Sequence, residues 1–206
     1  MKNRFILSIM LPLAIVALLS FNFGLWKFGL FMSILFLDGL FGILRVNKHI
    51  KNEERFYTSD MKIVENKIIP FGRYTGILLF GTLFTKLSAS KLSDEYKEHE
   101  MTHKVQGFET GYILMYFIYL LEGFFWTIKL IITFPKWYFS EETKELKWYQ
   151  KIKEALIKAY SHICFDQEAH CGEIYDDYKN RRLWYGWLPF LFNDDDSKTD
   201  LELLPE

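Results

Sequence analysis

The chain has 206 residues, which is long enough for one domain with its own core and for further segments beside it. Its formal net charge is only −1, and this balance argues against a protein that binds nucleic acid. Half of the residues are hydrophobic and 18% are aromatic, a high share for a soluble protein, and the apolar residues concentrate at the front of the chain.

Two apolar runs at the front predict a membrane-anchoring helical hairpin. The first, Phe5–Trp26, has no charge and as a helix would extend roughly 33 Å, enough to cross a hydrocarbon core. The second, residues 28–44, is marginal for a span and contains Asp38, whose charge is costly in lipid and is expected to face protein or the interface. A signal peptide is the alternative for the first run, because Lys2 and Arg4 precede it, but no small-residue cleavage site follows.

Basic residues flank the hairpin on both sides, whereas Lys27 alone lies between the two runs. The positive-inside rule then predicts that the remaining chain lies on the cytoplasmic side of the membrane. If only the first run spans, the remainder lies on the other side. Cys164 and Cys171 would be about 10 Å apart on one helix, beyond disulfide reach, and are predicted to be free thiols. The flanking cations are Lys2, Arg4, Arg45, Lys48 and Lys51.

A short β element and a polar helix are predicted next. The Pro and Gly spacing of residues 68–84, "IIPFGRYTGILLFGTLF", favours one or two short strands with a turn at residues 70–74. Ser93 or Asp94 is the predicted N-cap of the helix that follows.

A third apolar run, Tyr112–Phe134, is long enough to span a membrane. Glu122 and Lys129 lie seven positions apart on one face of it, so a partly buried or interfacial helix is an equal alternative. Pro135 is predicted to end this helix.

Two further helices are predicted after the third run. Residues 140–160 favour a helix with Ser140 as its N-cap, and residues 165–182 favour another. The predicted fold is therefore mainly helical. It comprises a transmembrane hairpin over residues 1–50, a helical domain with a short β element over residues 51–192, and an acidic disordered tail over residues 193–206.

The polar helix contains an HExxH motif made of His99, Glu100 and His103. Residues i and i+4 share one helix face, so the two imidazoles can bind one zinc ion, and Glu100 can take the proton of a zinc-bound water. The motif arises by accident in on the order of one chain per hundred of this length, as a solvent-exposed charged helix. A third ligand is needed, and the candidates are Glu109, Glu168 and His170. Glu109 has the metzincin spacing but lacks the required glycine at position 106.

Two segments together resemble a bacterial family of membrane-associated, gluzincin-like HExxH proteins. They are "HEMTHKVQGFE" and "AYSHICFDQEAHCGEIYDDYKNRR", and the likeness covers roughly residues 68–190. More broadly, the pairing is similar to membrane zincins such as the HtpX and CAAX-processing proteases. The resemblance implies Glu168 as the third zinc ligand. Asp166 stands where the family usually has Glu, and His170 stands where it has an aromatic residue and adds a competing ligand.

The motif and the resemblance imply that residues 51–192 are a zincin-like metallopeptidase domain and that the membrane is a bacterial inner membrane. Together they predict a membrane-anchored zinc metallopeptidase that hydrolyses peptide bonds with a water activated by Glu100. The predicted cofactor is Zn²⁺, and the predicted partners are the lipid bilayer and a protein or peptide substrate, without nucleic acid. One alternative is a non-catalytic membrane protein that keeps the zincin scaffold and its metal site for sensing or assembly. Another is a helical membrane protein whose His and Glu cluster is accidental.

Overall fold

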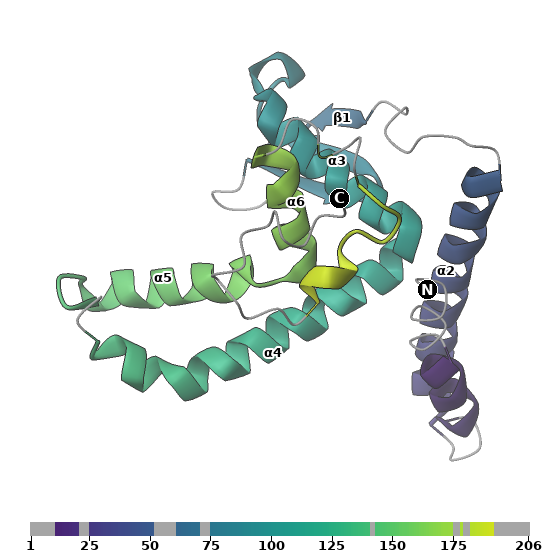
Figure 1. The fold of residues 1–206 in the computed structure, drawn as a ribbon, viewed down its shortest axis with the longest axis horizontal. Helices are drawn as coiled ribbons and strands as arrows, with labels where there is room; N and C mark the ends of the chain where they lie inside the picture. Colours follow the sequence, from purple (N-terminus) through teal and green to yellow (C-terminus); the bar gives the residue numbers. More distant parts are fainter. Residues whose placement is uncertain are drawn as a thin grey trace. The chain divides into compact units, whose positions relative to one another are not determined.

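The computed structural model shows a mainly helical chain with one small sheet, as the sequence predicted (Figure 1). It divides into two compact units. The first contains the chain up to Tyr116 together with Leu183–Tyr185, and the second contains residues 117–182 and the chain from Gly186 onward. The residues that the structure describes are 11–20, 25–51, 61–70, 75–140, 143–174, 178 and 182–191. The predicted acidic tail and most of the predicted turn at residues 70–74 lie outside them.

Within the part of the chain that the structure describes, two helices are long and apolar enough to cross a membrane. They are α2, Trp26–Lys51, and α4, Tyr112–Tyr138. Helix α2 is longer than the apolar run of residues 28–44, because it continues through the basic residues that follow this run. Within the first run, the described residues form a shorter apolar helix, Leu11–Ser20, and the rest of that run lies outside them.

Asp38, the charge inside α2, caps the start of α4. Its carboxylate accepts hydrogen bonds from the backbone N–H groups of Ile113 at 2.7 Å and Leu114 at 2.9 Å. A negative charge at a helix N-terminus satisfies free N–H groups and complements the helix dipole. Gly111 makes room for it, since a Cβ there would lie 2.5 Å from Asp38 and its φ of 89° favours glycine. The expectation that Asp38 faces protein is confirmed.

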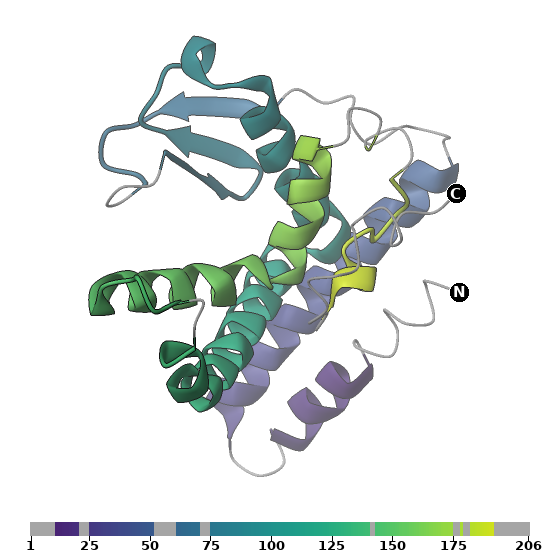
Figure 2. The same cartoon turned by 60° about the vertical axis from the view of Figure 1, so that its left-hand side comes forward.

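A three-stranded sheet stands beside α3 in the first unit (Figure 2). Strands β2, Gly76–Leu79, and β3, Thr82–Thr85, pair antiparallel, while β1, Lys62–Glu65, pairs parallel to β3. Phe80 and Gly81 join β2 to β3 with φ values of 49° and 76°, as a two-residue hairpin turn requires. The hairpin confirms the predicted strands, whereas β1 lies in a polar segment where no strand was predicted.

Helix α3, Asp94–Thr110, carries the HExxH motif and begins where the sequence predicted. Ser93 is its N-cap and accepts a hydrogen bond from the backbone N–H of Tyr96. Tyr96 packs on a small core formed by Leu78 and Leu83 of the sheet together with Leu92. The start of α3 is therefore tied to the sheet.

The predicted end of the third apolar helix is wrong. Pro135 lies inside α4, which continues to Tyr138. A proline removes one N–H donor from a helix and disfavours helical conformation in the residue before it. Pro135 lies close to the end of α4, with three helical residues after it. Ser140 then closes the end of α4 by donating its hydroxyl hydrogen to the Trp137 carbonyl at 2.7 Å.

The predicted start of the next helix is also wrong. Helix α5 is Trp148–Ser161, and its N-cap is Lys147, whose backbone N–H donates to the side chain of Gln150 at 2.9 Å. The Lys151 ammonium of α5 donates a hydrogen bond to the carbonyl of Tyr138, the last residue of α4, at 2.7 Å. This contact links the two helices. The remaining helices are η2, Ala89–Lys91, α6, Cys164–Ile174, and η4, Leu188–Phe190.

Candidate metal centre

His99 and His103 lie on one face of α3 with their Nε2 atoms 3.1 Å apart. Their rings are nearly perpendicular, at 84°. When two nitrogens bind the same tetrahedral zinc ion at about 2.0–2.1 Å, they lie about 3.3 Å apart. The pair therefore has the separation that two ligands of one ion need. An N–H···N hydrogen bond between neutral rings has a similar length, so the pair alone does not identify a metal.

Gln106 holds the ring of His103 from the other side. Its Oε1 atom is 2.8 Å from His103 Nδ1, and the Gln106 side chain is fully buried. An amide oxygen only accepts, so the proton of this hydrogen bond belongs to Nδ1, and Nε2 presents its lone pair toward His99. Metal-binding histidines are commonly oriented in this way. The burial of Gln106 and its contact with His103 favour an orienting role over that of a surface amide.

Glu100 follows His99 directly and is buried, with 7% of its surface exposed. Carboxylates are seldom buried without polar partners or a task that needs them. Its burial separates it from the exposed charges at the start of the same helix, such as Asp94 and Glu95. The interpretation of this stretch as a uniformly solvated charged helix is therefore wrong at Glu100.

Glu109 is too far along α3 to join the histidines. The helix runs without a break from Asp94 to Thr110, so ten residues place Glu109 about 15 Å beyond His99 along the axis. Its Oε1 atom instead accepts a hydrogen bond from the backbone N–H of Tyr185 at 2.8 Å. The metzincin-like alternative is thus excluded, because the missing glycine leaves the chain helical where that pattern turns.

Glu168 lies in α6 and is fully buried in the second unit. Its Oε1 atom accepts hydrogen bonds from the Tyr178 hydroxyl at 2.6 Å and Arg182 Nε at 2.7 Å, and its Oε2 atom accepts one from Arg182 Nη2 at 3.2 Å. Sequence reasoning missed this ion pair, because nothing in the motif indicates that Arg182 is the partner of Glu168. The convergence of Glu168 with the histidines of α3 stays a prediction.

His170 is exposed, and its Nδ1 atom lies 2.7 Å from a carboxylate oxygen of Glu173, one helical turn away. Asp166 is buried and accepts hydrogen bonds from the hydroxyls of Tyr119 and Tyr160, the latter at 3.0 Å. The hydroxyl of Tyr160 is therefore used within the second unit.

Buried side chains of the second unit have strongly shifted acidities. Burial raises the pKa of the Cys164 thiol well above its ordinary value, and the nearby Glu122 carboxylate raises it further. Burial also raises the pKa of Tyr178, and the charge of Glu168 adds to this shift. Both groups are therefore neutral at physiological pH. Cys164 and Cys171 are free and buried, which confirms the predicted thiols.

Histidine and acidic side chains among the described residues form groups that could bind a metal ion, and His99 and His103 are among their members. No protein-family model, curated protein or solved structure matches this chain. The resemblance to gluzincin-like membrane proteins therefore stays a prediction from the two motifs.

Proposed function

We propose that this protein is a membrane-anchored zinc metallopeptidase. The observation that carries the proposal is the arrangement on α3. Two imidazole Nε2 atoms lie 3.1 Å apart, Gln106 contacts the far nitrogen of the His103 ring, and Glu100, the residue after His99, is buried. An accidental HExxH in a solvated helix requires none of these three features.

In the proposed mechanism, His99 and His103 hold the ion and Glu100 moves the proton. Zinc, when bound, supplies a water molecule of lowered pKa and polarises the peptide carbonyl. Glu100 accepts the proton of that water and passes it to the leaving amine as the peptide bond breaks. Gln106 keeps the proton of His103 on Nδ1, so that Nε2 remains available as a ligand.

Glu168 is the proposed third ligand, and its ion pair sets a condition on this role. Both carboxylate oxygens accept hydrogen bonds from Arg182. Each carboxylate oxygen has two lone pairs, and those of Oε1 are taken by the Tyr178 hydroxyl and Arg182 Nε, so an ion would bind through Oε2, which it would share with Arg182 Nη2. We propose that Arg182 and Tyr178 orient the carboxylate for the ion, as residues behind a metal ligand commonly do.

The proposed location is a bacterial inner membrane with the peptidase on the cytoplasmic side. Helices α2 and α4 supply segments of sufficient length and apolarity. Strand β2, at the edge of the sheet, is the proposed docking strand for an extended peptide, which would have to displace the Tyr116 hydroxyl from the Leu78 carbonyl and the Phe80 N–H. An added strand would bind there by backbone hydrogen bonds.

The test combines metal content with cleavage of a peptide library by the full chain in detergent. We expect bound zinc in the wild type, its loss in His99→Ala and His103→Ala, and loss of cleavage with zinc retained in Glu100→Gln. Glu95→Gln, an exposed carboxylate on the same helix, is the matched control and should behave like wild type. If the wild type binds zinc but shows no peptide cleavage that is lost in Glu100→Gln, the proposed enzymatic activity is refuted and the non-catalytic alternative is supported. Absence of zinc from the wild type would refute both.

A further inference from the structure

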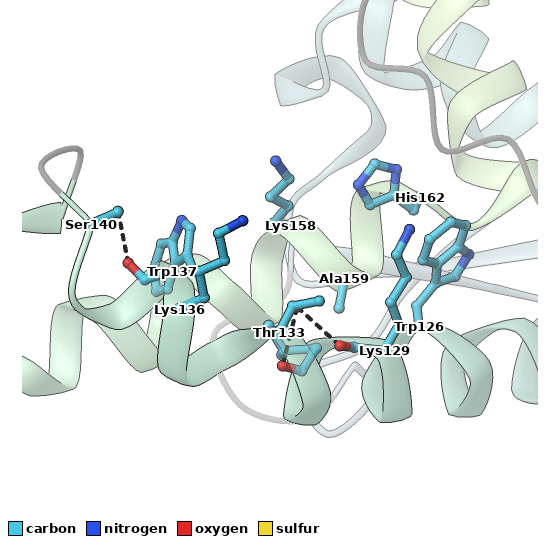
Figure 3. Close-up of a pocket in the computed structure, with 10 residues that line it drawn as sticks. Trp126, Lys129, Thr133, Lys136, Trp137, Ser140, Lys158, Ala159 and His162 are labelled. Carbon is cyan, nitrogen blue, oxygen red and sulfur yellow. Dashed lines mark hydrogen bonds between the residues drawn. The ribbon is translucent and has the colours of Figure 1, made fainter.

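A pocket in the second unit lies between α4 and α5 (Figure 3). Its volume is about 480 Å³, comparable to that of small-molecule sites. Most of its wall comes from one face of α4, and α5 with the residue after it supplies the rest. The lining residues are Trp126, Lys129, Leu130, Thr133, Lys136, Trp137, Ser140, Lys158, Ala159 and His162.

The charge of this pocket is all of one sign. Lys129, Lys136 and Lys158 line it, and none of the lining residues that the structure describes is acidic. Figure 3 shows Lys129 and Lys136 rising from α4 toward the side on which Lys158 and His162 lie. Ammonium groups that line one concave site attract an anion into it.

The aromatic wall restrains part of this charge. The Lys129 ammonium lies 4.8 Å from the centroid of the Trp126 ring, and the ring of His162 stacks on the same indole at 4.7 Å. Trp126 and His162 are buried, so the floor of the pocket is held by packing. A preorganised cation needs less ordering when an anion arrives than a freely rotating surface lysine does.

Two of the lysines also have a simpler explanation. Lys136 and Lys158 lie in the last turns of α4 and α5, where a positive charge complements the helix dipole. This explanation does not cover Lys129, which lies in the middle of α4. It also does not require that all three line one pocket.

The outer side of the same helices indicates the source of the anion. Ile128, Ile131 and Ile132 of α4 are exposed, and so are Leu156 and Ile157 of α5. Exposed aliphatic side chains on a helix long enough to span suit contact with acyl chains. Basic pockets beside tryptophans on such helices suit the head groups of anionic lipids. We propose that this pocket binds the phosphate of an anionic phospholipid. The proposal depends on the second unit alone and not on the metal centre.

The test measures the thermal stability of the full chain in a neutral detergent, with four added probes compared in turn. They are phosphatidylglycerol, phosphatidylcholine, glycerol 3-phosphate and inorganic phosphate. A ligand that binds only the folded state raises the melting temperature. We expect phosphatidylglycerol alone to raise it, by several degrees, and the shift to decrease at high salt.

Charge-matched variants assign the effect to the pocket. We expect the triple variant K129Q/K136Q/K158Q to lose most of the phosphatidylglycerol shift. The control K144Q/K147Q/K153Q removes the same charge from residues that do not line the pocket and should keep it. Because Lys136 and Lys158 are exposed, the double variant K136Q/K158Q should fold even if the triple variant does not. Equal shifts with the two soluble phosphates would overturn the lipid assignment. No shift, or equal losses in the pocket and control variants, would overturn the site.

Discussion

Arg182 offers the sharpest test of how the second unit is held together. Its guanidinium pairs with Glu168, and the two side chains are 2% and 0% exposed. Arg182→Met keeps an apolar stem but leaves the carboxylate buried with the Tyr178 hydroxyl and without its cation. Removing one partner of a buried pair costs about 3–5 kcal/mol, because an uncompensated charge stays in a medium of low dielectric constant.

In a chain of this length, about 1 kcal/mol shifts the melting temperature by about 2–4 °C. We therefore expect Arg182→Met to lower it by about 6–20 °C in a fluorimetric melt in detergent. Tyr178→Phe removes one hydrogen bond to a charged acceptor, so it should cost less, about 1.5–3 kcal/mol. The double variant E168M/R182M should recover much of the loss because it buries no charge. If Arg182→Met melts with the wild type, or if the double variant melts below the single, the pair does not support the fold in this way.

The same variants test the role of Glu168 toward a metal. If Glu168 is the third ligand, Glu168→Gln should weaken zinc binding and Arg182→Met should not abolish it, because the carboxylate is still present. Zinc content unchanged by Glu168→Gln, measured on folded protein, would assign Glu168 to the ion pair alone. Glu154→Gln in α5, an exposed carboxylate, controls for the loss of charge.

Three other predictions follow from single contacts. Asp38→Ala removes the cap of α4 and should cost about 1 kcal/mol, with an upper limit of about 2 kcal/mol, in the same melt; an unchanged melting temperature would contradict the capping role. Gly42→Ala should destabilise by about 1–3 kcal/mol, because the new Cβ would lie 2.4 Å from a backbone carbonyl of α3, whereas Gly123→Ala meets nothing closer than 3.8 Å and should be tolerated. Cys164 and Cys171 should resist a maleimide at pH 8 in the folded protein, since both are buried and the raised pKa of Cys164 suppresses its thiolate; rapid labelling before unfolding would refute this.

The features that sequence reasoning located correctly are local ones. Ser93 caps α3 through a hydrogen bond that reaches only three residues ahead. The shared face of His99 and His103 follows from helical periodicity alone. The hairpin of β2 and β3 needs only a two-residue turn between two short apolar strands.

Except at Ser140, whose partner is three residues away, the features that were missed depend on partners distant in the chain. Strand β1 is short and half-exposed, with Ile63 and Val64 between two charged residues, and only its parallel pairing with β3 makes it a strand. Asp38 was recognised as a costly charge, but its partners lie 75 and 76 positions away. Ser140 was a plausible N-cap by residue type, yet its hydroxyl closes the preceding helix instead of opening the next.

Glu168 combines both kinds of information. Its place in a motif-like segment predicted a metal ligand, and this prediction rests on what its neighbours in the sequence resemble. Its buried contacts with Arg182 and Tyr178 show that the carboxylate already has a structural partner of opposite charge. A carboxylate that lies between a guanidinium and a divalent ion attracts both of them. Its negative charge therefore offsets the repulsion that the two cations would have if they faced each other directly. The ion pair is therefore compatible with a ligand role but also sufficient without one. For this reason the zinc content of Glu168→Gln, rather than the presence of the motif, distinguishes a three-ligand hydrolytic site from a histidine pair on a helix.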